Sequence, residues 1–105
     1  MKEINILITA IGGDIGSNII NILNAQEGVK FNVYGTDINE TAIAQLRSTN
    51  PNLPVERLQV AAVEKLPYTD NYFNHIISSA VLHFANSTQH FKAMLTEMAR
   101  VLKTN

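Results

Sequence analysis

The sequence has 105 residues, which is enough for one small domain spanning 1–105 and too few for a separate substrate domain. Its formal charge is −1, with 46% hydrophobic and 16% charged residues, so we expect an ordered chain without a nucleic-acid or anionic-membrane partner. It has no cysteine, which excludes disulfides and thiolate metal sites. No metal is expected either, because the three histidines, His75, His83 and His90, do not have the spacing of metal ligands.

The chain begins with a pattern that predicts a buried strand. Residues Ile4–Ala10 form an almost unbroken apolar and β-branched run, which is typical of a strand covered on both faces. After a glycine cluster, apolar side chains recur at helical spacing, at Ile15, Ile19, Ile22 and Leu23. We expect Gly28 to end this first helix.

Two further strands and a helix are predicted in the middle of the chain. Phe31–Thr36 has the β-branched and aromatic composition of a strand. Ala42–Leu46 predicts a short helix, with Asn39 as its expected N-cap. The prolines and asparagines of 48–54 indicate a loop, and Arg57–Ala62 is the third predicted strand.

The last part of the chain predicts a fourth strand, Phe73–Ala80, and a final helix with Ser87 as its N-cap. The apolar side chains of that helix step by four, three and four, at Phe91, Leu95, Met98 and Leu102. The alternation of strands and helices predicts an α/β, Rossmann-like three-layer sandwich, with a parallel sheet of about four strands in the order 3-2-1-4. No apolar run approaches the roughly 18 residues of a spanning helix, and Met1–Glu3 begins no secretory signal, so we expect a cytoplasmic protein without membrane contact.

A ligand site is predicted beyond the carboxyl ends of the strands, where the strand order reverses. Gly12, Gly13 and Gly16 lie between the first strand and its helix, where glycine permits close approach and a helix N-terminus offers N–H donors. Asp37 follows the second strand, a position that suits a carboxylate accepting hydrogen bonds from ribose hydroxyls. Together these features indicate an adenosine-containing ligand. The alternative is a plain tight turn, with Asp37 capping the next helix.

Two carboxylates narrow the choice of ligand. Asp14, inside the glycine turn, would repel a pyrophosphate, whereas it would tolerate the ammonium group of a methionine moiety. Asp37 likewise disfavours a 2′-phosphate. S-adenosylmethionine and NAD therefore both remain open on these residues alone.

Three segments carry a resemblance to a known family. They are YGTDINETAIAQL (34–46), VAAVEKLPYTDNYFNHIISSAVLHF (60–84) and FKAMLTEMARVLK (91–103). In this order and spacing, residues 34–103 resemble the class I S-adenosylmethionine-dependent methyltransferases. The resemblance implies S-adenosylmethionine as cofactor and methyl transfer to an unknown acceptor. Residues 1–36 also resemble the first Rossmann half of pre-ATP-grasp domains and of short-chain dehydrogenases.

The resemblance also implies roles for individual residues. The expected cofactor contacts are Gly12, Gly13, Asp14, Gly16, Asp37, Ile38, Val63, Glu64 and Ala80. Asp37 would hold the ribose, Ile38 would pack on the adenine, and Val63 with Glu64 would lie near the adenine edge. Residues 80–84 would line the floor beside the reactive methyl group. His83, in that floor, is the candidate catalytic residue, and its alternative role is a structural hydrogen bond at the end of a strand.

The resemblance stops at Lys103, which leads us to expect a sheet truncated before a fifth strand. The fourth strand would then be an apolar sheet edge, and such edges pair with something. We therefore expect self-association, as a homodimer, through that strand or the last helix. Two alternative functions remain open: a non-catalytic truncated or chimeric module that folds and self-associates, and an NAD-binding dehydrogenase-like domain. The second lacks the family's Tyr-x-x-x-Lys pair.

Two other groups of side chains are expected to be structural. The aromatic residues Tyr68, Tyr72 and Phe73 are expected to pack under the loop that carries them, with stacking on a base as the alternative. The basic residues of the last helix are expected to form a solvated face, at Lys92, Arg100 and Lys103.

Overall fold

Strands and α-helices alternate through the residues that the computed structural model describes, which are 2–12, 14–78 and 86–104. In chain order the elements are β1 (Lys2–Thr9), α1 (Asp14–Asn24), β2 (Val29–Asp37), α2 (Glu40–Thr49), β3 (Leu58–Val60), β4 (His75–Ser78) and α3 (Thr88–Val101). A 3₁₀ turn, Val55–Arg57, precedes β3. Within these ranges no helix is long and apolar enough to cross a membrane.

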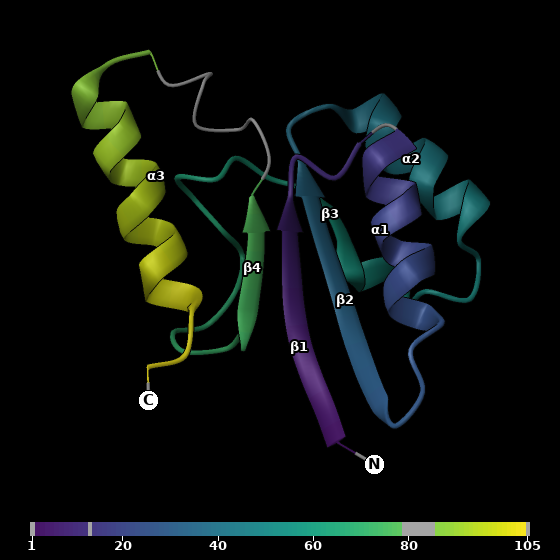
Figure 1. Cartoon of the computed structure of the whole chain (residues 1–105). Coiled ribbons are helices and arrows are strands. Elements are labelled where there is room, and N and C mark those ends of the chain that lie inside the picture. Colours follow the sequence, from purple (N-terminus) through teal and green to yellow (C-terminus); the bar gives the residue numbers. More distant parts are fainter. Residues whose placement is uncertain (1, 13, 79–85, 105) are drawn as a thin grey trace.

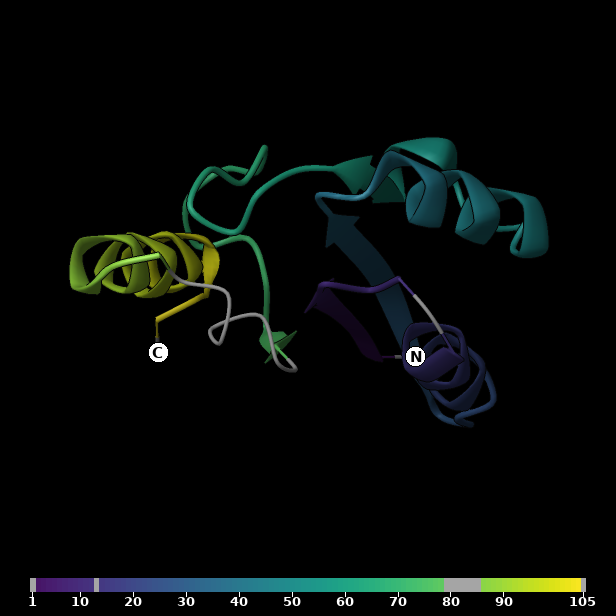
Figure 2. The ribbon, with the colours of Figure 1, turned by 90° about the horizontal axis from the view of Figure 1, so that it is seen from above.

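The strands form one parallel sheet in the order β3-β2-β1-β4. β1 and β2 pair from Lys2–Val29 to Thr9–Thr36, whereas β3 and β4 pair only toward the carboxyl ends of their neighbours. The helices α1 and α2 cover one face of the sheet, and α3 lies on the other side (Figures 1 and 2). The predicted three-layer α/β fold and its strand order are therefore confirmed.

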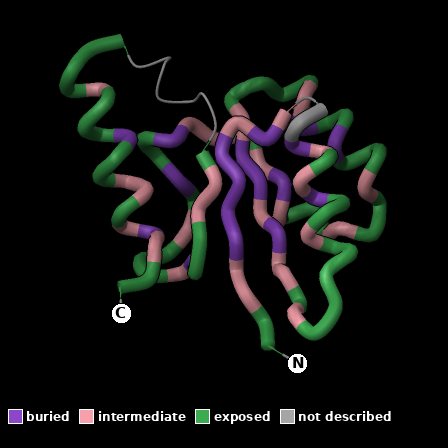
Figure 3. Tube along the Cα trace, viewed as in Figure 1, coloured by how far each residue is buried: buried purple, intermediate pink, exposed green. Residues whose placement is uncertain are grey.

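Side chains alternate along β1 between two apolar cores, because successive strand residues point to opposite faces. The core on the side of α1 and α2 comprises Ile6, Ile8, Ile11, Ile20, Val33, Ile43, Leu46 and Leu58. The core on the side of α3 comprises Leu7, Leu66, Phe73 and Val101. Both cores meet along the buried centre of β1 and β2, which is visible in Figure 3. The central strands are thus packed against apolar side chains on both faces of the sheet.

The third strand is shorter than the predicted range Arg57–Ala62. It pairs only beside Gly35–Asp37, where β2 ends. Before it, the N–H of Arg57 donates to the carbonyl of Pro54 at 3.0 Å and closes the 3₁₀ turn. The strand therefore begins after that turn and ends where its pairing partner ends.

The fourth strand also differs from the prediction, Phe73–Ala80. Its ladder with β1 begins at His75. Phe73 instead bridges to Leu102, beyond α3, so its backbone joins the end of α3 to the sheet. The predicted strand residues 79 and 80 lie outside the described residues.

Helix boundaries follow the expected caps, with one exception. The Asn39 side chain accepts the N–H of Ala42 at 3.1 Å, and the Ser87 hydroxyl accepts the N–H of His90 at 3.0 Å. Gly28 does not end the first helix: α1 stops at Asn24, and Gly28, with φ of +79°, turns the chain into β2.

The buried faces of two helices differ from the predicted stripes. On α1, Ile20 is fully buried and Ile22 is 61% exposed. On α3 the buried residues are Met94, which was expected in the core, and Val101, whereas Leu95 is exposed. Helical spacing defines a broad apolar stripe, and the element packed against the helix decides which part of that stripe is covered.

Candidate functional site

The carboxyl ends of β1 and β2 bring the glycine turn and Asp37 together. The Asp37 Oδ2 accepts the N–H of Gly12 at 3.0 Å, and its Oδ1 accepts the N–H of Asn39 at 2.9 Å. A Cβ on Gly12 would lie 2.8 Å from the same Oδ2 and 2.7 Å from the Cβ of Ala42, so only glycine allows this approach. Because Asn39 caps α2, Asp37 is not the helix cap and instead reaches across to the turn.

The turn that follows β1 is held by close backbone packing. The N–H of Ile11 donates to the carbonyl of Thr36 at 3.0 Å. A Cβ on Gly16 would lie 1.6 Å from the carbonyl oxygen of Ile11, so α1 begins in direct backbone contact with the turn. Ala10 has φ of +52°, a left-handed conformation that costs a non-glycine residue about 1 kcal/mol. The turn geometry alone therefore requires glycine at position 16.

Ile38 follows Asp37 directly and is 74% exposed. By contrast Thr9, the last residue of β1, and Thr36, near the end of β2, are buried, so Ile38 is a large apolar side chain left in water at the end of a central strand. Asp37 and Ile38 thus place an acceptor group and an apolar surface side by side at the carboxyl edge.

The turn after β3 lies next to β2 and carries two of the predicted residues. The N–H of Ala61 donates to the carbonyl of Asp37 at 3.1 Å, so this turn continues from the same edge. Val63 is buried at 5% exposure, whereas Glu64 is exposed and pairs with His90 of α3. The Glu64 Oε2 and His90 Nε2 are 2.6 Å apart. Glu64 is therefore already engaged by a side chain that the sequence did not suggest.

His90 is held at both ring nitrogens. Its Nδ1 accepts the N–H of Asn86 at 3.0 Å, so a proton on Nε2 satisfies the contact with Glu64 as well. The only sequence signal for this arrangement is the cap at Ser87, which places His90 in the first turn of α3.

The expectation of a solvated Arg100 is wrong. Each of its five N–H groups donates a hydrogen bond, to Glu97 Oε1, Glu97 Oε2, Asp70 Oδ1, the Tyr68 carbonyl and the Leu66 carbonyl. The hydrogen bonds that Arg100 donates to Glu97, and secondly the one to Asp70, raise the pKa of Arg100. The hydrogen bond from Arg100 is also the main cause that lowers the pKa of Glu97. Asp70 lies 30 residues before Arg100 in the sequence, so the spacing of residues along α3 could not predict this ion pair.

The aromatic residues form a packed cluster beneath α3. Phe73 is fully buried, and the rings of Tyr34, Tyr68 and Tyr72 approach it edge-on, with centroids 4.9–5.2 Å away. The hydroxyls of Tyr34 and Tyr72 are 2.5 Å apart. Burial is the main cause that raises the pKa of Tyr68. The cluster therefore has the structural role expected for it.

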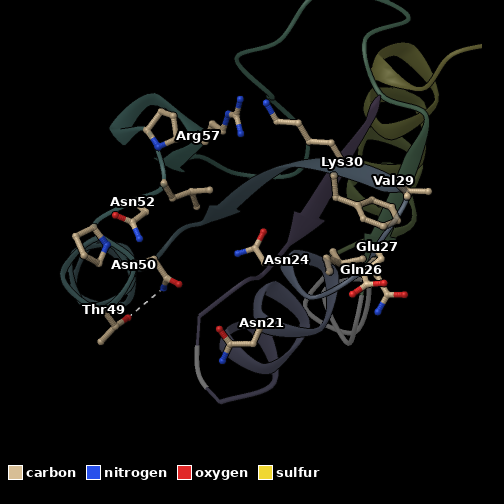
Figure 4. A pocket seen from close by; sticks show the side chains of 16 residues that line it. Asn21, Asn24, Gln26, Glu27, Val29, Lys30, Thr49, Asn50, Asn52 and Arg57 are labelled. Carbon is tan, nitrogen blue, oxygen red and sulfur yellow. Dashed lines mark hydrogen bonds between the residues drawn. The ribbon is translucent and has the colours of Figure 1, made fainter. Parts of the chain in front are cut away.

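An open groove of about 810 Å³ lies at the opposite end of the sheet. It runs between the carboxyl ends of α1 and α2 and the start of β2, and Asn24, Lys30 and Arg57 project into it (Figure 4). Of the predicted site residues that lie within the described ranges, none lines it. The groove is thus separate from the edge at which Gly12 and Asp37 meet.

The structure brings together Gly12, Asp37, Ile38 and the turn with Val63 and Glu64. Asp14 is the first residue of α1, and Gly16 lies in its first turn. The predicted contacts Gly13 and Ala80 and the candidate catalytic residue His83 lie outside the described residues. In the part of the chain that is described, no three His, Cys, Asp or Glu side chains cluster as metal ligands.

Comparison with known proteins identifies similar domains. A family model described as a methyltransferase domain matches residues 13–105. Among solved structures, the YcgJ protein from Bacillus subtilis is 21% identical, with a TM-score of 0.73 over 97% of this chain and 41% of that chain. A SAM-dependent methyltransferase from Methanosarcina mazei is 23% identical, with a TM-score of 0.74 over 98% of this chain and 49% of that chain. A SAM-dependent methyltransferase from Aquifex aeolicus is 22% identical, with a TM-score of 0.69 over 97% of this chain and 53% of that chain.

These structures show that the fold is shared. The chain spans 41–53% of the length of the three proteins. A comparison with curated proteins gave no match.

Proposed function

Since this chain belongs to the methyltransferase domain family, whose cofactor is S-adenosylmethionine, we propose that it binds this cofactor at the carboxyl edge of its sheet and acts as a methyltransferase core. The observation that carries the proposal is the contact of the Asp37 carboxylate with the Gly12 turn, beside the exposed Ile38. The family match favours this function over the dehydrogenase and pre-ATP-grasp alternatives. The methyl acceptor is not specified by these residues.

The residues at this edge suit the cofactor chemically. Each carboxylate oxygen of Asp37 accepts one backbone N–H, and its remaining lone pairs would accept hydrogen bonds from the two ribose hydroxyls. Ile38 would cover one face of the adenine with apolar surface. The N–H groups that open α1, at Asp14 and Gly16, would face the carboxylate of the methionine part.

When bound, S-adenosylmethionine would supply a methyl group carried on a positively charged sulfur; an acceptor atom would take this methyl group in line, and S-adenosylhomocysteine would be the leaving group. The chain contributes orientation, because β1 and β2 are clamped between two cores and hold Gly12 and Asp37 at a fixed separation. Residues 80–84, which include Ala80 and His83, would form the floor beside the methyl group.

Replacing Asp37 with asparagine is expected to weaken binding of S-adenosylhomocysteine by about 30-fold, because the amide nitrogen cannot accept the ribose hydroxyls and a charged acceptor contributes roughly 2 kcal/mol. Isothermal titration calorimetry measures the change. Glu40→Gln is the matched control, since Glu40 also carries a negative charge, in the first turn of α2, whereas the Gly12 N–H donates to Asp37. Absence of heat from the wild-type chain at millimolar ligand would sink the proposal, as would equal affinity in Asp37→Asn.

We further propose that two copies associate through β4 and α3. Within the described strands β4 pairs only with β1, and in both views α3 lies outside β4, on the side away from β1 (Figures 1 and 2). Phe91 and Leu95 of α3 are 38% and 43% exposed. An open edge beside an apolar helix face is a surface that a second copy would cover.

Sedimentation at tens of micromolar is expected to give a species larger than a monomer. Leu95→Lys places a charge on the exposed face of α3 and should shift the chain to monomer without unfolding it. Val55→Lys is the control, because Val55 is 62% exposed on the far side of the sheet, beside β3. A wild-type chain that is monomeric throughout this range contradicts the association.

A further inference from the structure

The turn after β3, residues 61–66, is anchored at its two ends by different parts of the molecule. At its start the N–H of Ala61 donates to the carbonyl of Asp37 at 3.1 Å. Within it the N–H of Lys65 donates to the carbonyl of Ala62 at 3.0 Å, which closes a short turn around Val63 and Glu64. The placement of these two residues therefore depends on where the far end of the turn is held.

Side chains of α3 hold that far end. The N–H of Leu66 donates to Glu97 Oε2 at 2.7 Å, and the Leu66 carbonyl accepts from Arg100 Nη2 at 3.1 Å. Both backbone polar groups of a residue that is 5% exposed are thus satisfied by two side chains of one helix. No strand supplies a backbone partner for Leu66 in the described part of the chain.

Arg100 holds this turn through hydrogen bonds that a lysine side chain could not make in the same geometry. Its Nε and Nη2 grip both oxygens of Glu97, at 2.7 and 3.0 Å, while Nη1 reaches the Tyr68 carbonyl and Asp70 at 2.8 Å. A planar fork with five donors makes all these contacts at once, whereas a lysine ammonium has three donors and no plane. The guanidinium and Glu97 thus fix the stretch from Leu66 to Asp70 against α3.

A second contact ties the middle of the turn to the same helix. Glu64 Oε2 lies 2.6 Å from His90 Nε2, and His90 is itself oriented by the N–H of Asn86. The turn is therefore held by the first and the last part of α3, while its start is held by Asp37 of β2. α3 and β2 together determine how Val63 and Glu64 sit beside the edge that carries Asp37.

We propose that Arg100 and Glu97 are positioning residues for the base of the bound nucleoside, acting through the 61–66 turn although neither residue lies at the carboxyl edge. This role rests on the proposed function, because it assumes that the base lies against Val63 and Glu64. It predicts that cofactor affinity and base discrimination depend on the C-terminal half of α3.

The test compares two ligands that differ only in the base, S-adenosylhomocysteine and S-inosylhomocysteine. Arg100→Lys is expected to weaken binding of the adenine compound by about fivefold or more and to reduce the ratio of the two dissociation constants toward one. Glu97→Gln should act in the same direction. Hydrogen exchange without ligand should show loss of protection at the Leu66 amide in both variants.

Arg47→Lys is the matched control, because Arg47 donates one hydrogen bond to a backbone carbonyl, that of Leu58, at 2.6 Å. Arg47→Lys should leave the ratio of dissociation constants within about twofold of the wild-type ratio, even if it lowers the melting temperature as much as Arg100→Lys does. A loss of stability alone would lower the melting temperature in both arginine variants and leave the ratio unchanged.

The outcomes separate this inference from the proposed function. If the wild-type chain binds and Arg100→Lys keeps the wild-type ratio and affinity, the positioning role is overturned and the proposed function stands. If the wild-type chain binds neither compound, the proposed function fails and the positioning role fails with it. Retained protection of the Leu66 amide in Arg100→Lys would also overturn the role, since the turn would then be held without Arg100.

Discussion

Replacing Gly16 with alanine is expected to destabilise the chain by about 3 kcal/mol or more, or to prevent folding. The new Cβ would lie 1.6 Å from the carbonyl oxygen and 2.6 Å from the carbonyl carbon of Ile11, and both atoms are backbone. To avoid this steric clash, α1 would have to move away from the turn. Helix propensity alone would favour alanine by about 1 kcal/mol, so the sign of the change decides between propensity and packing. Urea denaturation measures it.

Gly28→Ala is the control for that substitution. Nothing lies within 4 Å of a Cβ at Gly28, but its φ of +79° is strained for alanine and costs about 1 kcal/mol. Gly16→Ala therefore tests the effect of a steric clash, and Gly28→Ala tests the effect of an unfavourable φ angle. A smaller loss for Gly16→Ala than for Gly28→Ala would contradict the close contact between α1 and Ile11.

Phe73→Ala is expected to lower the free energy of unfolding by about 4 kcal/mol, since the ring is fully buried against three tyrosines. That is a large part of the roughly 5–15 kcal/mol typical of a small domain. The N–H of Phe73 donates to the Val101 carbonyl, and its own carbonyl accepts from Lys103, both at 2.8 Å. Loss of the ring should therefore loosen the end of α3 as well, which near-ultraviolet circular dichroism and urea denaturation would both detect.

Tyr72→Phe is the matched variant in the same cluster. It keeps the ring and removes only the hydroxyl that meets Tyr34, so its expected cost is about 1 kcal/mol. If Tyr72→Phe cost as much as Phe73→Ala, the hydroxyl pair rather than the buried ring would hold the cluster together.

Local patterns in the sequence were sufficient for the topology and for the proximity of Gly12 and Asp37 at one edge of the sheet. The apolar run of β1 and the alternation of strands with helices predict a parallel sheet, and short connections leave few ways to order its strands. Gly12 follows β1 and Asp37 ends β2, and parallel strands end at one edge of the sheet. Their proximity is therefore a consequence of strand order, which the sequence was enough to predict, whereas the hydrogen bond at 3.0 Å between them appears only in the structure.

The sequence was not sufficient for features that depend on which distant segments meet. β3 stops at Val60 because β2 stops at Asp37, and no local signal in 57–62 records the length of another strand. The exposure of Leu95, which lies in the predicted apolar stripe of α3, depends on the sheet beneath that helix. Pairing length and helix rotation are properties of the contact and not of either segment.

The sequence by itself therefore determined the periodicity, the strand order and the residues at strand ends, because these follow from local sterics and from the rules of chain connection. Only the tertiary structure decided that Arg100 and His90 hold the turn beside the candidate site. Their partners Leu66 and Glu64 lie 34 and 26 residues away. A side chain that bonds to distant backbone or carboxylate groups looks, in sequence, the same as one that projects into water, and folding alone distinguishes the two.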